Sequence, residues 1–296
     1  MQKLKDILEY TAFILSVTIF KILPCFLSIV LLKFLFYLFG YIFGIRKKIV
    51  TRQLKLCFPE KSSREIKELI KKIYSELAIT VAEVFIFEDS YFQNKIELEN
   101  FEEIKKALAL GRGVMIVSAH FSNWEIGAKI VAKEYSEVYG VVKNQRNKLF
   151  NDYLDKKRKA SGIKTIEMRN ALKNIVLALK KNQVVVFLVD QYATNQGVET
   201  DFMGHKTKTY TSAAQISHRF KTPIIVAFDV RDENGKHKII FSDFFVCEEP
   251  VSIEGSEPLL AKNEIILDKT RHINFFIEEY IKKYPHLWFW VHRKWR

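Results

Sequence analysis

The chain has 296 residues, of which 48% are apolar and 27% charged, so it can form one large α/β domain with a sizeable core. This composition argues against a disordered chain, and the three scattered cysteines, Cys25, Cys57 and Cys247, argue against a disulfide scaffold and fit a reducing compartment. The net charge of +13 favours an anionic partner, but charge alone leaves nucleic acid, anionic lipid and acidic protein open.

The N-terminal part is strongly apolar. Between Tyr10 and Phe43 the charged side chains are Lys21 and Lys33, and Pro24 is expected to break or kink a helix. Each apolar stretch between these points is shorter than the roughly 18–20 residues of a simple spanning helix. Three alternatives remain open: a transmembrane helix with snorkelling lysines, a membrane-embedded or interfacial hairpin, and a buried helix of a soluble protein.

A basic cluster follows the apolar part directly and comprises Arg46, Lys47, Lys48, Arg52 and Lys55. Cations beside an apolar segment favour its cytoplasmic side and contact with anionic head groups, although a solvated helix face has the same pattern. We therefore expect a membrane-associated helical segment over residues 1–45 and an α/β domain over residues 46–296.

Beyond Pro59 the pattern is that of an α/β domain. A capping box at Ser62 and Glu65 begins an amphipathic helix that reaches about Phe85. Short β-branched runs then alternate with helical segments, which predicts a mixed, largely parallel sheet flanked by helices. The predicted strands are Val114–Ser118, Val138–Val142, Val184–Val189, Pro223–Val230 and Lys238–Phe241, the last two joined by an Asn234-Gly235 turn. The predicted helices are Glu125–Ser136, Lys148–Ala160, Asn170–Lys181, Thr211–Lys221 and Asp268–Lys283.

Two polar clusters follow predicted strands, where α/β sheets tend to bind ligands: residues 119–125, and Asp190 with Gln191. On one helix His120 and Glu125 would point about 140° apart, but a strand, a tight turn and a helix start can bring them together. Glu125 would then accept a hydrogen bond from one imidazole nitrogen, and the other nitrogen would take a proton from a substrate hydroxyl. A plainer interpretation is that Ser122 and Glu125 form a capping box and that His120 is merely hydrogen-bonded.

Four stretches, in order, resemble the late acyltransferases of lipid A biosynthesis, the lauroyl and myristoyl transferases, and their relatives that acylate mycobacterial mannosylated phosphatidylinositol. His120 and Glu125 are similar to the HX4D/E motif of glycerolipid acyltransferases. The stretches are Arg46–Pro59, Ser118–Gly127, Val189–Gln191 with Phe202–Gly204, and Leu287–Arg296. Two positions depart from the family pattern: Val142-Lys143-Asn144 stands where the family often has Tyr-Arg-Pro, and Gln53-Leu54 replaces Asn-Leu.

This resemblance implies an acyl carrier protein thioester as donor, a lipid A precursor as acceptor, and a place on the cytoplasmic face of the bacterial inner membrane. His120 would be the general base and Glu125 would orient it. The oxyanion would be stabilised by N–H groups near Asn123 or by a cation, for which Arg158 is the candidate. The other expected substrate-binding residues are Lys143, Arg146, Asp190 and Gln191.

We expect no cofactor and no metal, because no metal-ligand spacing is present and His292 has no evident ligand partners. The C-terminal tryptophans form either an interfacial aromatic belt or a packed terminal segment. A lysophospholipid or glycerol-3-phosphate acyltransferase that uses acyl-CoA is the first rival, disfavoured by Ala119 before the histidine and by Glu125 in place of aspartate. A non-enzymic membrane or nucleic-acid binder is the second, and no nucleic-acid fingerprint supports it.

Overall fold

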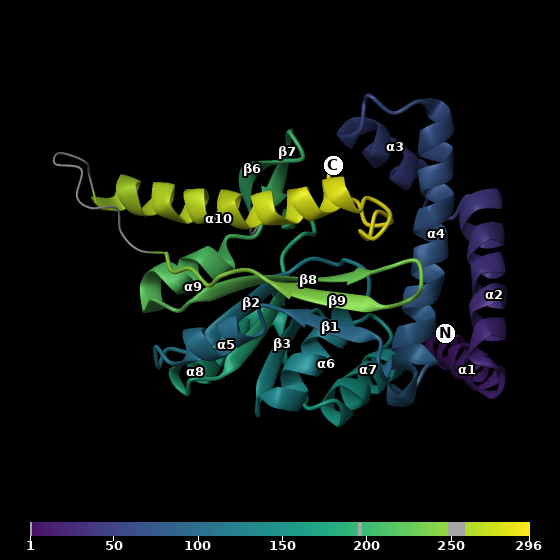
Figure 1. Cartoon of the computed structure of the whole chain (residues 1–296), viewed down its shortest axis with the longest axis horizontal. Helices are drawn as coiled ribbons and strands as arrows, with labels where there is room; N and C mark the ends of the chain where they lie inside the picture. The colour runs from purple at the N-terminus through teal and green to yellow at the C-terminus, as the bar shows by residue number, and fades with distance from the viewer. Residues whose placement is uncertain (1, 195–196, 248–257) are drawn as a thin grey trace.

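The computed structural model describes residues 2–194, 197–247 and 258–296, and within them a seven-stranded sheet lies between layers of helices (Figure 1). The strands are β1 (Ile96–Glu99), β2 (Val114–Ser118), β3 (Val138–Val142), β4 (Ile163–Glu167), β5 (Val184–Leu188), β8 (Ile224–Arg231) and β9 (His237–Phe241), with a separate hairpin of β6 (Val198–Phe202) and β7 (His205–Thr209). The α-helices are α1 (Gln2–Ile22), α2 (Cys25–Phe36), α3 (Lys47–Cys57), α4 (Ser63–Phe85), α5 (Glu102–Leu108), α6 (Trp124–Glu134), α7 (Lys148–Ala160), α8 (Ala171–Lys180), α9 (Ser212–Phe220) and α10 (Pro258–Lys283).

The strand order is β1-β9-β8-β2-β5-β3-β4. β2 pairs in parallel with β5 and β8, and β3 pairs in parallel with β5 and β4, whereas β9 is antiparallel to β8 across the turn that contains Gly235. The predicted mixed, largely parallel sheet is therefore confirmed. Its central strands end at the same edge, so the loops that follow β2 and β5 are neighbours.

Two apolar cores lie on opposite faces of the sheet, because successive strand residues point to opposite sides. Met115 and Val117 of β2 belong to the core that also holds buried residues of α4, α8, α9 and α10. Val114 and Ile116 belong to the core beneath α5 and α6. Both faces are covered, which is why β2 and β5 are almost entirely apolar.

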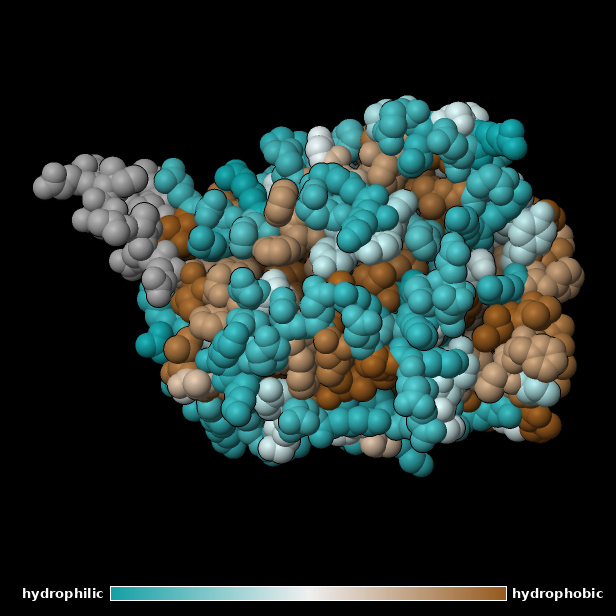
Figure 2. Space-filling view, in the orientation of Figure 1, coloured by the Kyte–Doolittle hydropathy of each residue, from teal (hydrophilic) through white to brown (hydrophobic). Residues whose placement is uncertain are grey.

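The N-terminal segment forms two helices, because Pro24 stands between α1 and α2 and is the N-cap of the second. A π-helical turn over Tyr37–Ile42 continues α2, and the packing leaves no room for a side chain at Gly40, where a Cβ atom would lie 2.3 Å from the Tyr74 ring. Cys25–Ile42 is long and apolar enough to cross a membrane, and just 17% of it is buried, which does not fit the buried-helix alternative. Apolar side chains gather on the side of the molecule where α1 and α2 lie (Figures 1 and 2).

The capping box at Ser62 and Glu65 and the predicted central elements are present, most within one or two residues. The helix predicted over Asp268–Lys283 starts ten residues earlier, at Pro258. The sequence did not predict β1, β4, α5 or the β6–β7 hairpin. Both β1 and β4 are edge strands with exposed, charged side chains, so they lack the apolar run that identifies a central strand.

Candidate active site

His120 lies in a tight turn between β2 and α6, as the sequence predicts. Ser122 in this turn has a left-handed backbone with φ of 47°. The turn is fixed from outside by the C-terminal segment: the Phe289 N–H group donates to the His120 carbonyl at 3.0 Å, and the Ser122 N–H group donates to the Leu287 carbonyl at 2.8 Å. Two stretches that are far apart in the sequence therefore hold the imidazole between them.

Asp190 is the carboxylate that binds the imidazole. β2 and β5 pair with Ser118 opposite Leu188, so the residues two places further along, His120 and Asp190, come together. His120 Nδ1 lies 2.8 Å from Asp190 Oδ1, while Asp190 Oδ2 accepts hydrogen bonds from the His120 N–H group at 3.1 Å and from Trp288 Nε1 at 2.8 Å. Burial alone would raise the pKa of Asp190, but the His120 ring and these donors more than offset it and lower that pKa to about 2.

Glu125 does not bind His120, and the expectation that its carboxylate orients the imidazole is wrong. Its two oxygens instead accept from Arg158, with Oε1 2.5 Å from Nη2 and Oε2 3.2 Å from Nε. The reason is the direction of α6: Glu125 is its second residue and points toward α7, whereas the imidazole turns back toward the end of β5. The capping-box alternative is also wrong, because Asn123 Oδ1 caps α6 and the Ser122 hydroxyl has no partner among the described residues.

The second ring nitrogen of His120 faces a neutral group. Gln191 Nε2 lies 3.3 Å from His120 Nε2. Aromatic rings flank the imidazole, with ring centroids 4.9 Å away for Trp124 and 5.9 Å away for Phe289. With Nδ1–H donating to Asp190, the Nε2 lone pair is available to accept a proton, and the sequence-predicted Asp190 and Gln191 thus meet the imidazole from both sides.

Glu125 and Arg158 line a cavity of about 460 Å³, together with Phe87, Asn123 and Lys157. Both side chains of the ion pair are about one-fifth exposed, so solvent reaches the pair. Burial lowers the pKa of Lys157, and the neighbouring Lys21 ammonium lowers it further. His120 is not among the lining residues, so this cavity does not contain the imidazole and lies on the α7 side of the motif.

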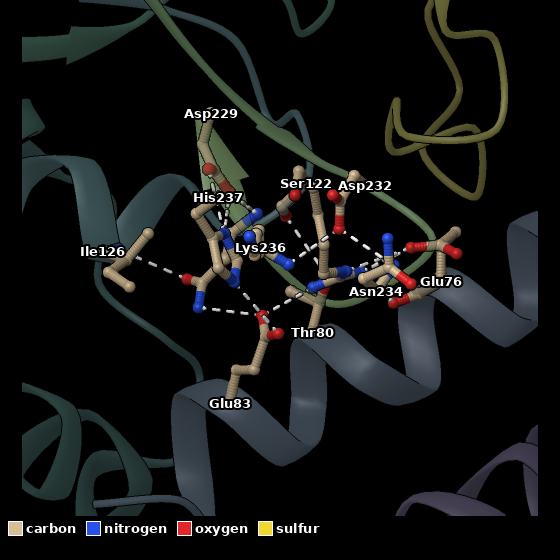
Figure 3. A network of polar contacts seen from close by, with 12 residues as sticks. Glu76, Thr80, Glu83, Ser122, Ile126, Asp229, Asp232, Asn234, Lys236 and His237 are labelled. Atoms are coloured by element: carbon tan, nitrogen blue, oxygen red, sulfur yellow. Dashed lines mark hydrogen bonds and ion pairs between the residues drawn. The ribbon is translucent and has the colours of Figure 1, made fainter. Parts of the chain in front are cut away.

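Asn123 belongs to a buried polar network rather than to an open anion site. Figure 3 labels its partners Glu83 and Asp229. Its N–H group donates to Asp229 Oδ2 at 2.9 Å and its amide Nδ2 donates to Glu83 Oε2 at 3.2 Å. The Asn123 N–H group is therefore not a free donor, and the expectation that N–H groups near Asn123 stabilise the oxyanion stays a prediction for the groups that follow it. Contact between its side chain and a substrate stays a prediction, because Asn123 does line the cavity beside Glu125.

The same network holds two basic side chains: Arg231 binds carboxylates of α4, and His237 lies between Glu83 of α4 and Asp229 of β8. Glu83 Oε2 accepts from Arg231 Nη1 at 2.5 Å, and Glu83 Oε1 lies 3.2 Å from His237 Nε2. His237 Nδ1 lies 2.9 Å from Asp229 Oδ1. Burial lowers the pKa of His237, but Asp229 and Glu83 outweigh this effect and raise that pKa to about 9. The network ties α4 and β8 to the turn that carries His120.

Lys143 and Arg146 lie in the exposed loop after β3, and neither lines the cavity that contains Glu125. The structure does not bring them to the imidazole, and substrate contact for both residues stays a prediction.

The C-terminal segment is packed rather than spread as an aromatic belt, because Trp288, Trp290 and Trp295 are buried. Sequence reasoning missed the role of Trp288 as a donor to Asp190; its place in the C-terminal tryptophan signature was the available signal. It also missed Lys294, whose Nζ is buried without a hydrogen-bond partner among the described residues, 4.6 Å from the Phe202 ring centroid. Burial lowers the pKa of Lys294 to about 8.

A family model described as bacterial lipid A biosynthesis acyltransferase matches residues 2–296. The chain is 26% identical over 258 residues to the lipid A biosynthesis lauroyltransferase of Escherichia coli, and 23% identical over 257 residues to the palmitoleoyltransferase of the same organism; each match covers 85% of this chain and 79% of the relative. A lipid A biosynthesis acyltransferase of Haemophilus influenzae is 21% identical over 97% of this chain and 91% of its own length.

Proposed function

Because the chain belongs to the family of bacterial lipid A biosynthesis acyltransferases, we propose that it transfers a fatty acyl chain from acyl carrier protein to a hydroxyl group of a lipid A precursor. The family and the relatives support acylation of lipid A, and the thioester donor is part of the proposal. The acceptor would be a hydroxyl on an acyl chain already attached to a phosphorylated glucosamine disaccharide.

The observation that carries the proposed mechanism is the 2.8 Å contact between His120 Nδ1 and Asp190 Oδ1. Asp190 fixes the ring with Nδ1 protonated, so Nε2 takes the proton from the acceptor hydroxyl as its oxygen attacks the thioester carbonyl. The carboxylate stabilises the imidazolium that results. When the tetrahedral intermediate collapses, the C–S bond breaks and the imidazolium gives its proton to the departing thiolate.

Glu125 keeps a part in catalysis in this proposal, but as a positioning residue: it acts through Arg158 and not on the imidazole. Its ion pair with Arg158 lines the adjacent cavity, where the guanidinium can face the developing oxyanion. Glu125 holds that guanidinium by two hydrogen bonds and so fixes its direction. Lys143 and Arg146 would contact the substrates from the exposed loop after β3.

We also propose that the protein works at the cytoplasmic face of the inner membrane. The apolar Cys25–Ile42 segment is exposed and leads directly to the basic residues of α3, which is the order expected at a cytoplasmic membrane surface. Acyl carrier protein would reach the site from that side.

The test is an assay with the purified full-length protein, a lipid A precursor and acyl carrier proteins loaded with chains of several lengths, with products identified by mass spectrometry. We expect turnover, and we expect His120→Ala to lower kcat by about 1,000-fold or more, as loss of a general base does. Glu125→Ala should lower kcat/KM by about 100-fold. His272→Ala, which removes an exposed histidine of α10, is the matched control and should keep full activity.

Turnover by a correctly folded His120→Ala variant at the wild-type rate would refute the mechanism. Turnover with acyl-CoA and a lysophospholipid, but not with the lipid A precursor, would replace the proposed reaction by its first rival.

A further inference from the structure

A second cavity, of about 700 Å³, lies between α3 and the C-terminal segment and is strongly basic. Four of its seven lining residues are arginines: Arg46, Arg52, Arg293 and Arg296. Among the residues that the structure describes, no Asp or Glu lines it. In the part of the chain that the structure describes, the arginines that form ion pairs with carboxylates are Arg158 and Arg231, so the four cavity arginines retain their charge unneutralised.

The buried amide of Gln53 assembles this cavity. Its Nε2 donates to the Trp290 carbonyl at 2.8 Å and to the His292 carbonyl at 2.9 Å, and its Oε1 accepts from the Lys294 N–H group at 2.7 Å. This one side chain holds the C-terminal segment against α3, so arginines from opposite ends of the sequence face the same space. The departure from the family pattern at Gln53 is thus a structural link between the two walls of the cavity.

The cavity wall also reaches the imidazole. Phe289 lines the cavity, donates its N–H group to the His120 carbonyl at 3.0 Å, and has its ring centroid 5.9 Å from that of His120. His292 on the same wall is half-buried, and its Nδ1 has no hydrogen-bond partner among the described residues. A ligand bound in this cavity would therefore be separated from the proposed general base by the Phe289 ring.

Arg46, one of the lining residues, adjoins exposed apolar residues in the chain. Ile42, Phe43 and Ile45 are exposed and stand directly before Arg46. A molecule that has acyl chains in the membrane and a charged head group would therefore meet Arg46 at the membrane surface. This arrangement favours a lipid over a water-soluble ligand.

We propose that this cavity binds a phosphate group of the glycolipid acceptor, an inference that rests on the proposed function. A planar guanidinium group can bind two oxygens of one phosphate at once. Four guanidinium groups without carboxylate partners match the charge of a phosphate dianion better than that of a carboxylate monoanion. A concave space of this size admits a phosphorylated sugar, whereas an acidic carrier protein would need a broad surface. Phosphate binding here holds the sugar so that an acyl-chain hydroxyl can reach His120 Nε2.

The experiment compares a phosphorylated lipid A precursor with the same lipid after removal of its phosphates, using the full-length enzyme. Arg52→Ala and Arg293→Ala should each raise KM for the phosphorylated acceptor by about tenfold and leave kcat nearly unchanged, because a charge-assisted hydrogen bond is lost. For the dephosphorylated acceptor, wild type and variants should have the same, higher KM. Arg112→Ala, which removes an exposed arginine before the start of β2, is the matched control and should change neither constant.

Three results would overturn the inference while turnover itself upholds the proposed function. In the first, the variants change KM equally for both acceptors. In the second, KM rises for the acyl carrier protein instead of the acceptor. In the third, inorganic phosphate inhibits at the concentration at which the phosphorylated lipid binds. The second result would identify a protein-docking surface, and the third a site for free phosphate.

If the wild-type protein does not acylate the lipid A precursor, the proposed function fails and a binding measurement decides the cavity separately. The probe is flotation with phosphatidylcholine vesicles with and without phosphatidic acid. Phosphatidic acid should increase the bound fraction of wild type, and the increase should be several-fold smaller for Arg52→Ala. Equal binding by both proteins would overturn the phosphate site as well.

Discussion

Two histidines of this protein bind an aspartate through Nδ1 at almost the same distance, yet their surroundings differ. His120 Nδ1 lies 2.8 Å from Asp190, and its side chain is 19% exposed. His237 Nδ1 lies 2.9 Å from Asp229, and its side chain is fully buried. The pairs differ at the second ring nitrogen: His120 Nε2 faces the neutral amide of Gln191, whereas His237 Nε2 faces the carboxylate of Glu83.

The second nitrogen decides what each ring can do. Carboxylates on both sides of His237 stabilise its charged form, and the ring has no exposed atom through which to pass a proton to a substrate. His120 has one carboxylate, which sets its tautomer, and an Nε2 atom next to a group that a substrate hydroxyl can displace. We infer that the first pair serves chemistry and the second serves stability.

Asp190→Asn should have the largest effect. The asparagine amide can donate to His120 Nδ1, which would move the ring proton to Nε2 and remove the base, and the indole of Trp288 would lose a charged acceptor. We expect kcat to fall by about 1,000-fold with little change in KM. Steady-state kinetics with the lipid A precursor measure both constants.

Asp243→Asn is the matched control for this variant, because Asp243 is exposed and away from the imidazole. It should leave kcat unchanged. An Asp190→Asn enzyme with wild-type kcat would remove the distinction between the two histidines.

His237→Gln should act on stability instead. Removing the cation leaves Asp229 and Glu83 as buried carboxylates with one partner fewer, which costs about 3–5 kcal/mol of unfolding free energy. Chemical denaturation followed by tryptophan fluorescence measures this loss. We expect the folded fraction to keep kcat within about tenfold of wild type, because the network meets the active-site turn at Ser122 and Asn123 and not at the His120 ring. A 1,000-fold fall in kcat would place His237 in the catalytic machinery.

The stability should also depend on pH through His237. Its pKa is raised in the folded protein from an ordinary 6.5 to about 9, so its contribution is fully present below pH 6.5 and is lost as pH rises through 9. The expected loss is about 3 kcal/mol across this window. The groups that face the ring are Asp229, Glu83 and the nearby Arg231. Denaturation of wild type and His237→Gln from pH 6 to 9.5 isolates the effect, and identical pH profiles would contradict it.

The sequence predicted the centre of the fold better than its edges. The inner strands β2 and β5 are mostly buried and β3 is half-buried, and all three are largely apolar, so their bounds were visible to within about a residue. The edge strands β1 and β4 carry charged side chains and were missed, because solvent exposure removes the apolar pattern.

The same limit explains the error at the active site. The turn that carries His120 is a local feature and was predicted correctly. The predicted carboxylate partner of His120 was wrong, because the contact with Asp190 depends on β5 pairing beside β2. Strand order is a long-range property that local sequence patterns do not contain. The nearest acidic residue in the sequence, Glu125, was therefore taken for the nearest in space.

Gln191→Ala should have the smallest effect, and it tests whether the neutral neighbour of His120 matters by itself. The 3.3 Å contact between the Gln191 amide and His120 Nε2 is long for a hydrogen bond, and a substrate hydroxyl must replace it before proton transfer. Its loss should therefore lower kcat/KM by about three- to tenfold, the value of one neutral hydrogen bond. Gln191→Asn keeps the amide group but shortens the side chain, so it distinguishes loss of the amide from a change in the position of the amide. A loss of about 100-fold or more would mean that Gln191 donates to the oxyanion. His120 would then differ from His237 in having Gln191 beside it as a group that stabilises the transition state, and not merely in having an Nε2 atom free to meet a substrate.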